Sequence, residues 1–436
     1  MKIAWFTPFS RKSAIGRCSA GIVAELAQFA SVDLWHPEAS DERATSVPRV
    51  RFRRGIDADL RQLSEYDLVV YNFGNHLPFH REIFQVSRRM PGLVVLHDLV
   101  MHHFFASYFL EDLKDPQAYV NAMHRLYGER GRETALGIVS GKRPGAWESD
   151  EVVEFPFFED VLDGALGVIT HSDYLCQRVS QVFAGPVCKI PLAYEVEALP
   201  VLSRGELGIQ KDDILIVTVG HLNPNKRLHS VIRALGRLGN RVPKFAYVLL
   251  GPYDKGYHEH LVELVHANHL DESVRFVGYV SDEILHSYMR HADICINLRF
   301  PAIEGASASA IEEMWHGKAV VVTDTGFYRE LPDGAVVKIA PDREEEELSA
   351  ALRTLLGDRA ARERLGATAR SFAEKHFHAK RYVQEFLKFA WQVRGSRPVL
   401  EFADRMASEL RALGVASSMS VAEGIAGEAY NLFFED

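Results

Sequence analysis

The sequence predicts an α/β protein built from two doubly wound, Rossmann-like domains. The chain has 436 residues, which is too long for one ordinary hydrophobic core and makes two domains the default. Apolar runs of strand length alternate with amphipathic helical patterns, as in parallel βαβ units. After about residue 204 the same alternation starts again. This restart predicts the second domain.

The composition is that of an ordinary soluble globular enzyme. Hydrophobic residues make up 47% of the chain and charged residues 25%, and the net charge of −9 argues against a nucleic-acid partner. The four cysteines have no C-x-x-C spacing and predict free, buried thiols in a reducing cytoplasm. No apolar run reaches the roughly 18 residues of a transmembrane helix, and the N-terminal apolar run is too short for a signal peptide. We therefore expect a cytoplasmic protein.

Basic residues cluster locally in the first half of the chain. The basic residues are concentrated in RVRFRRG (49–55) and SRRM (87–90), and in the group Arg11, Lys12 and Arg17. A solvated protein surface is the simpler interpretation of these clusters. The alternative is peripheral contact with the inner face of a membrane, where anionic lipids attract basic segments.

The first half contains an apolar run for each strand of a parallel sheet, and a mostly helical, aromatic segment at 106–163. Polar side chains stand at several of the strand ends, where ligands bind in such sheets. These side chains are Asn72, Asn75, His76, His97, Asp98 and His171. The expected strands are 2–6, 32–35, 67–72, 92–97, 165–172 and 188–196.

Two familiar nucleotide-binding loops are missing from the sequence. The first strand leads into TPFSRKSAIG and then a helix through SAGIVAELAQFA, without the G-x-G-x-x-G of dinucleotide-binding proteins. The turn GHLNPNKR (220–227) follows the first strand of the second domain without a P-loop motif. The expected strands of this domain are 214–220, 246–254, 273–281, 293–298, 319–326 and 334–340.

The stretch from Arg299 to Gly334 carries the most specific pattern. Glu304 and Glu312 enclose the seven residues GASASAI, and a helix is expected from about Ala306. The backbone N–H groups at the start of such a helix, with the positive end of its dipole, can hold a pyrophosphate. The two carboxylates would then flank the phosphates, one at a ribose and the other at a sugar.

This stretch resembles the retaining GT-B glycosyltransferases with the E-x7-E motif, the family that includes sucrose synthase and bacterial mannosyl- and glucosyltransferases. The resemblance rests on the E-x7-E spacing, on HGKAVVVTDTGFYREL after it and on FVGYVSDEILHSYMRHADI before it. It implies a GT-B fold, in which two Rossmann-like domains face each other across a cleft. It also implies a nucleotide-diphosphate sugar, a UDP- or GDP-sugar, as donor.

The resemblance also assigns roles to individual residues. Glu304 and His97 would contact the transferred sugar, and Lys226 would bind the diphosphate. His221 stands where the family usually has an arginine, so a second phosphate contact there would be charged only part of the time. The remaining expected binding residues are Glu312, Gly305, Ala306, Ser307, Ala308, Gly220, Gly278, Tyr279 and, in the first loop, Gly16.

The shift to turn-forming residues around 197–204, in PVLSRGELG, predicts the linker between the two domains. Residues 1–197 would form an N-terminal acceptor domain and 205–375 a C-terminal donor domain. A late helix, 379–394, would cross back to the first domain, as in other GT-B enzymes. Residues 398–436 would form a helical extension beyond the family core.

The predicted function is therefore sugar transfer from a nucleotide-diphosphate sugar to a hydroxyl of a glycan, a lipid-linked acceptor or a small molecule. No cofactor or metal is expected, because fixed N–H dipoles and Lys226 can stabilise the leaving diphosphate. Bacterial surface polysaccharide or secondary-metabolite glycosylation is the expected setting.

Other interpretations stay open at this point. A nucleotide-sugar epimerase of the same fold, a glycoside hydrolase using the two glutamates and a non-catalytic nucleotide-sugar binding module are the alternatives. The histidines His97, His102 and His103 also suggest a zinc site, although no further cysteine or histidine has ligand spacing.

Overall fold

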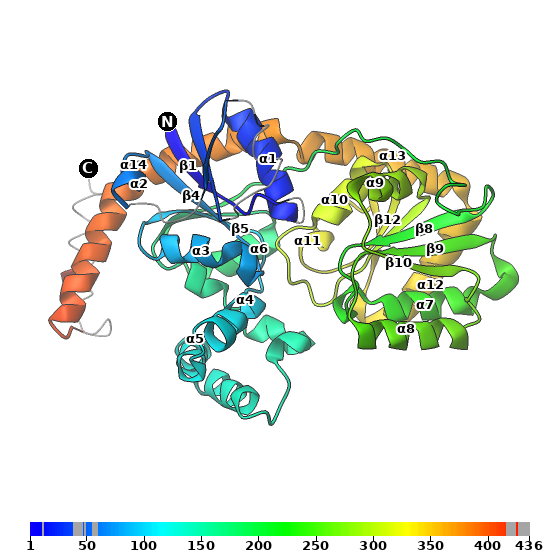
Figure 1. The fold of residues 1–436 in the computed structure, drawn as a ribbon, viewed down its shortest axis with the longest axis horizontal. Coiled ribbons are helices and arrows are strands. Elements are labelled where there is room, and N and C mark those ends of the chain that lie inside the picture. The colour runs from blue at the N-terminus through cyan, green and yellow to red at the C-terminus, as the bar shows by residue number, and fades with distance from the viewer. Residues whose placement is uncertain (11–12, 38–46, 48, 55–59, 416–423, 426–436) are drawn as a thin grey trace.

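The computed structural model describes residues 1–10, 13–37, 47, 49–54, 60–415 and 424–425. It contains two parallel sheets, which lie side by side in Figure 1 with helices around each. The strand orders, β3-β2-β1-β4-β5-β6-β7 and β10-β9-β8-β11-β12-β13, are both doubly wound. The predicted fold class is confirmed.

The first sheet is buried on both faces, which explains why its strands read as continuous apolar runs. All six residues of β4, for example, are buried. Its strands are β1 (Lys2–Phe6), β2 (Ser31–His36), β3 (Arg51–Arg54), β4 (Leu68–Phe73), β5 (Gly92–Leu96), β6 (Ala165–Thr170) and β7 (Val187–Lys189).

The second sheet repeats this construction, and its central strands β8, β9, β11 and β12 are almost wholly buried. Its strands are β8 (Ile214–Val219), β9 (Phe245–Leu250), β10 (Val274–Gly278), β11 (Ile294–Asn297), β12 (Ala319–Thr323) and β13 (Val336–Ile339).

Helices cover both sheets. Those of the first half are α1 (Ala14–Leu26), α2 (Leu60–Leu63), α3 (Leu77–Ser87), α4 (His102–Ser107), α5 (Pro116–Val139) and α6 (Asp173–Ser180). The second half has α7 (Leu228–Leu238), α8 (Lys255–Ala267), α9 (Asp282–His291), α10 (Ala308–Trp315), α11 (Gly326–Arg329), α12 (Glu344–Gly357), α13 (Arg359–His376) and α14 (Ala379–Ala412).

The last helix, α14, returns to the first sheet. It contacts α1 and β6, and the Phe386 ring meets the Trp5 ring edge-on at 5.5 Å between centroids. In Figure 1 it runs from the second half back past β1. The extension expected at 398–436 starts inside this helix, since α14 continues to Ala412, whereas 416–423 and 426–436 lie outside the described residues.

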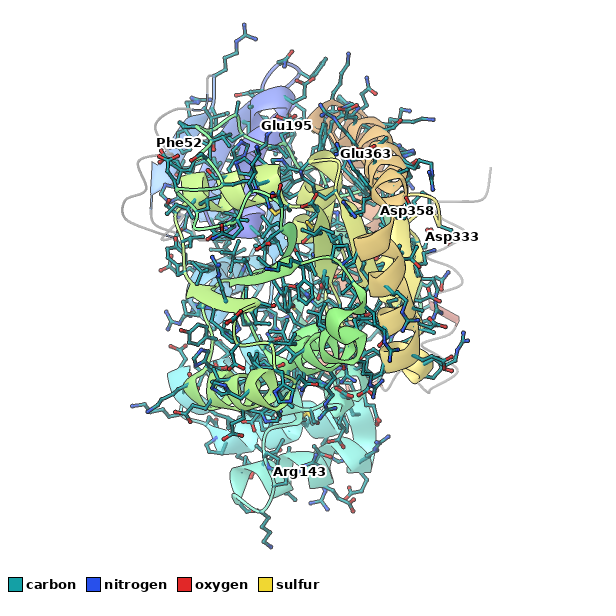
Figure 2. All side chains as sticks on the ribbon, turned by 90° about the vertical axis from the view of Figure 1, so that its right-hand side faces the viewer. Phe52, Arg143, Glu195, Asp333, Asp358 and Glu363 are labelled. Carbon is teal, nitrogen blue, oxygen red and sulfur yellow. The ribbon has the colours of Figure 1, made fainter. Side chains whose placement is uncertain are left out.

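A helical segment projects from the first half (Figure 1), and Arg143 marks its far end in Figure 2. It comprises α4, a π-helical turn (Tyr108–Asp112), α5 and short 3₁₀ turns up to Val161. His102 lies in its core, with Nδ1 2.7 Å from the Phe155 carbonyl oxygen and Nε2 2.8 Å from the Tyr119 hydroxyl. Both ring nitrogens are therefore used by the protein, which argues against the zinc interpretation.

The basic cluster at 49–55 contains a strand that the sequence analysis did not predict. Residues Arg51–Arg54 form β3 at the edge of the first sheet. Arg51 and Arg53 bind the buried Asp33 carboxylate at 3.0 and 3.3 Å. Charged side chains on an edge strand also oppose pairing with other chains. These two arginines are thus part of the fold, while Arg11 and Lys12 lie outside the described residues.

Candidate active site

The two halves of the chain meet where the loop after β5 runs against the loop after β11. The backbone N–H of Gly305 donates to the His97 carbonyl oxygen at 2.7 Å, and that of Val100 donates to the Ile303 carbonyl oxygen at 3.0 Å. Asp98 and Glu304 form an isolated antiparallel bridge between these bonds. The two loops therefore hold His97 and Glu304 at a common boundary.

A cavity of about 490 Å³ opens at this boundary and is lined from both halves. Nine of the thirteen residues to which the family resemblance gave a catalytic or binding role line it. They are His97, Gly220, His221, Lys226, Glu304, Ala306, Ser307, Ala308 and Glu312. The cavity thus gathers side chains that are more than 200 positions apart in the sequence.

Lys226 reaches the cavity from the turn after β8. Its side chain is buried, and Nζ donates to the Val219 carbonyl oxygen at 2.6 Å. Burial, together with the nearby Arg299, lowers the Lys226 pKa well below its usual range. Gly220, at φ 100°, leaves room for this side chain, because a Cβ there would lie 3.1 Å from Nζ. A bound anion would favour the charged ammonium form of Lys226.

Helix α10 begins at the cavity. Ser307 is its N-cap, and its Oγ accepts from the Ala310 backbone N–H at 3.2 Å. The helix starts two residues later than expected, so Glu312 is its fifth residue. Ala306, Ser307 and Ala308 line the cavity, which places the positive end of the helix dipole there.

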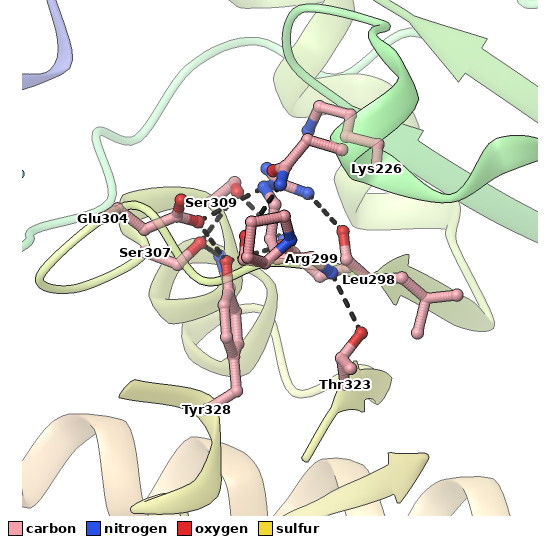
Figure 3. A network of polar contacts seen from close by, with 12 residues as sticks. Lys226, Leu298, Arg299, Glu304, Ser307, Ser309, Thr323 and Tyr328 are labelled. Atoms are coloured by element: carbon pink, nitrogen blue, oxygen red, sulfur yellow. Dashed lines mark hydrogen bonds and ion pairs between the residues drawn. The ribbon is translucent and has the colours of Figure 1, made fainter. Parts of the chain in front are cut away.

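Glu304 is held by a cation that the sequence analysis did not single out. Arg299 Nε lies 3.2 Å from Glu304 Oε1, and the Tyr328 hydroxyl donates to the same carboxylate (Figure 3). Arg299 is itself fixed by Thr323, whose hydroxyl accepts from the Arg299 backbone N–H at 3.0 Å. These contacts hold the Glu304 carboxylate in one orientation at the cavity wall. The signal in the sequence was an arginine directly after a buried strand.

Glu312 lies in a group of side chains from both halves. Burial raises its pKa, which a hydrogen bond from Tyr194 and the charge of Arg17 oppose. Arg17 also lies 3.7 Å from Asp282 on α9. Arg17, Tyr194 and Glu312 line both the main cavity and an adjoining one of about 340 Å³. Arg17, interpreted from sequence as a surface charge, therefore belongs to the boundary between the halves.

His97 is buried at the end of β5 and uses both ring nitrogens. Nε2 is 3.1 Å from Asn72 Oδ1, and Nδ1 is 3.2 Å from Nε2 of His171. The neighbouring Asp98 carboxylate accepts from the Asn75 backbone N–H at 2.8 Å, and burial raises the Asp98 pKa to about 7. The polar side chains that the sequence places at strand ends thus lie close together beside the cavity.

Four expected binding residues lie outside the cavity lining. Gly305 uses its N–H on His97 rather than facing a ligand, and its small size allows the loop contact described above. Gly16 lies in the first turn of α1 rather than in a loop, where a Cβ would meet the Pro8 carbonyl oxygen at 2.3 Å. Gly278 lies in the turn after β10 at φ 78°, and the Tyr279 side chain is exposed.

The described residues contain neither a metal-ligand group nor a disulfide. Among the described residues, no group of three or more histidine, cysteine, aspartate or glutamate side chains could hold a metal ion. All four cysteines are free, and burial raises the pKa of Cys18, which lines the cavity, to about 12. In the described part of the chain, no helix is long and apolar enough to cross a membrane.

The second half of the chain matches a family of sugar transferases. Residues 202–372 match the model of glycosyl transferases group 1. The chain is 28% identical over 205 residues to a D-inositol 3-phosphate glycosyltransferase of Nocardia farcinica, covering 45% of each chain. It is 30% identical over 184 residues to the protein of that name in Kineococcus radiotolerans, covering 38% of this chain and 42% of the relative. The chain thus spans less than half the length of these curated relatives.

Solved structures match over most of the chain. Anabaena HepE in complex with UDP has a TM-score of 0.61 at 18% identity, covering 90% of this chain and 100% of HepE. Sucrose-phosphate synthase from Thermosynechococcus elongatus has a TM-score of 0.61 at 17% identity, covering 91% and 100%. WaaG, a glycosyltransferase involved in lipopolysaccharide biosynthesis, has a TM-score of 0.54 at 15% identity, covering 86% and 95%. The fold is GT-B.

Proposed function

We propose that this protein is a retaining glycosyltransferase that moves a sugar from a nucleotide-diphosphate sugar to an acceptor hydroxyl without a metal ion. The observation that carries the proposal is the single cavity that Lys226, the start of α10, Glu304, Glu312 and His97 line together. The match of residues 202–372 to glycosyl transferases group 1 supports the same reaction class.

The diphosphate would bind between Lys226 and the N-terminus of α10. When the sugar–phosphate bond breaks, negative charge builds up on the leaving phosphate. Backbone N–H groups and a buried ammonium stabilise that charge without reorganisation, because they are already in position. The desolvated Lys226 is suited to this role, since an ammonium in a buried site interacts more strongly with an anion than one in water.

The sugar would lie against Glu304 and His97, and the ribose against Glu312. Arg299 and Tyr328 hold Glu304 as an oriented carboxylate, which suits it to binding hydroxyls and to stabilising a ring that gains positive charge. No residue of the cavity is a persuasive covalent nucleophile, and Cys18 is a poor one because of its high thiol pKa. The acceptor hydroxyl would then attack on the face from which the diphosphate leaves, which retains the anomeric configuration.

The donor is proposed to be a UDP- or GDP-sugar. Anabaena HepE, which has the same fold, has been solved with UDP and with UDP-glucose. The acceptor would be a glycan, a lipid-linked acceptor or a small molecule. Isothermal titration with UDP, GDP and ADP tests the donor side first. Binding of one of them that weakens in Lys226→Met supports the proposal, and failure of all three to bind contradicts it.

A further inference from the structure

A continuous line of polar contacts passes through His97 and ends at a backbone carbonyl on each side. At one end, His171 Nδ1 lies 2.9 Å from the Ile190 carbonyl oxygen, and His171 Nε2 lies 3.2 Å from His97 Nδ1. At the other end, His97 Nε2 lies 3.1 Å from Asn72 Oδ1, and Asn72 Nδ2 lies 2.9 Å from the Phe6 carbonyl oxygen. All three side chains are buried.

The backbone carbonyl oxygen at each end determines which atom must donate in the hydrogen bonds of the line. A carbonyl oxygen only accepts, so His171 Nδ1 must carry a proton for Ile190, and the Asn72 amide must turn its N–H₂ group toward Phe6. Asn72 Oδ1 is then an acceptor toward His97, whose Nε2 must carry a proton as well. If both rings are neutral, these two protons are the only ones they have.

When both rings are neutral, no proton is therefore left for a hydrogen bond between His97 Nδ1 and His171 Nε2. Two bare nitrogens face each other at 3.2 Å, and two lone pairs repel at that distance. One additional proton would complete every hydrogen bond in the line and leave the pair with a charge of one. The same geometry shows that neither ring nitrogen of His97 is free to bind a ligand.

The surroundings disfavour that charge in the unliganded protein. Burial lowers the His97 pKa well below its usual range, with His171 and His80 adding to the effect, and burial lowers the His171 pKa to about 4. Asp98 and Glu304 lie at the loop contact, and Tyr382 of α14 lies against the His171 ring. The further titratable groups of the cavity lining include Arg17, Cys18, His76, Lys226, Arg299 and Glu312. An anionic nucleoside diphosphate in this cavity would favour the charged form of the pair.

We propose that His171 and Asn72 are positioning residues for His97, and that the His97–His171 pair takes up one proton from solution when a nucleoside diphosphate occupies the cavity. His97 would then act on the donor through its charge and its ring surface rather than through a ring N–H. This inference rests on the proposed function, because it requires the diphosphate to bind in the cavity that His97 lines.

The test is proton uptake on binding. Titration calorimetry of the whole protein with UDP and GDP, in buffers of different ionisation enthalpy, gives the number of protons taken up. About pH 8 is suitable, because it lies well above the second phosphate pKa of about 6. His171→Gln removes one of the two rings that share the charge, and its amide N–H₂ can donate to His97 Nδ1, so this contact no longer needs an added proton. We expect the wild-type protein to take up about one proton more than this variant, and its affinity to fall up to about tenfold more per pH unit.

His102→Gln is the matched control. This histidine is also buried with both ring nitrogens partnered, but it lies outside the cavity, so its replacement should leave proton uptake unchanged. Equal uptake in wild type and His171→Gln would overturn the inference while leaving the proposed function standing. If UDP, GDP and ADP all fail to bind, the inference falls with the proposed function.

Nitrogen NMR of histidine-labelled wild-type protein tests the inference without any variant. On adding the nucleotide that binds, one imidazole should move to the shifts of an imidazolium. Two rings that each stay neutral in the saturated complex would overturn the inference.

Discussion

The backbone N–H of Gly305 donates to the carbonyl oxygen of His97 at 2.7 Å, and this bond joins the two halves of the protein at the candidate active site. Gly305 lies in the loop after β11 of the second sheet, and His97 directly follows β5 of the first sheet. The bond fixes Glu304 and His97 relative to each other. Their proposed joint action on one sugar depends on it.

Gly305→Ala should separate these loops. A Cβ at this position would lie 2.9 Å from the His97 carbonyl oxygen and 2.5 Å from Leu175 Cδ2, so one loop must move. We expect kcat for donor cleavage to fall at least about tenfold, because small misplacements of reacting groups are costly. Nucleoside diphosphate affinity should change little. Gly256→Ala in α8, where a Cβ meets nothing within 4 Å, is the control and should leave kcat unchanged.

Lys226→Met should weaken diphosphate binding but not nucleoside binding. A charge-assisted contact is worth about 1.5–3 kcal/mol, so the Kd for the diphosphate should rise about 10- to 150-fold. Lys318→Met, which removes another partly buried lysine whose Nζ donates to the Arg290 carbonyl oxygen, is the control. Titration calorimetry measures both ligands. A parallel loss of nucleoside and diphosphate affinity would mean that Lys226 is only structural.

The two glutamates should give different kinetic defects. Glu312→Gln should raise KM more than it lowers kcat, because the ribose is chemically unchanged during transfer. Glu304→Gln should lower kcat by about 2 kcal/mol of barrier, or about 30-fold, because the ring gains positive charge. His97→Ala should resemble Glu304→Gln. Steady-state kinetics on the three variants decide this, and the opposite pattern would reverse the two roles.

Glu313 should make stability depend on pH. Its side chain is buried, Oε1 accepts from Asn297 Nδ2 at 2.9 Å, and burial raises its pKa from 4.5 to about 8. Because the folded-state pKa is the higher one, the contribution is fully present below about pH 4.5 and is lost as the pH rises toward about 8. Glu313→Gln should therefore be more stable than wild type at pH 8 and similar at pH 4.5. Urea unfolding at both pH values measures this difference, and an equal difference at the two would contradict it.

The sequence predicted most of the fold because parallel strands that are buried on both faces read as continuous apolar runs. β4 and β12 are examples, and both were expected within about three residues of their observed ends. β3 escaped because Arg51 and Arg53 interrupt the apolar pattern, and their pairing with Asp33 on the neighbouring strand is visible only in three dimensions.

Contacts that form only in the folded protein also limit what the sequence predicts of the site. Ser307 could be singled out because it stands at the start of a helix, and Lys226 because the turn after β8 resembles that of the family. Arg299 and Tyr328 are important through their contacts with Glu304, and Arg17 through its contact with Asp282 from the other half. No local pattern encodes such pairings. Gly16 and Gly305 show the converse, since both glycines allow close approach between protein segments rather than to a ligand.

The central claim is that this protein cleaves a nucleotide-diphosphate sugar with retention and without a metal. The most direct test is proton NMR of the protein with a panel of UDP-, GDP- and ADP-sugars in the presence of EDTA, using water as the acceptor. The account predicts that one donor releases its nucleoside diphosphate and that the free sugar first appears in the anomeric configuration of that donor. First appearance of the inverted anomer, a strict need for a divalent ion, or an isomerised sugar still joined to its nucleotide would contradict it.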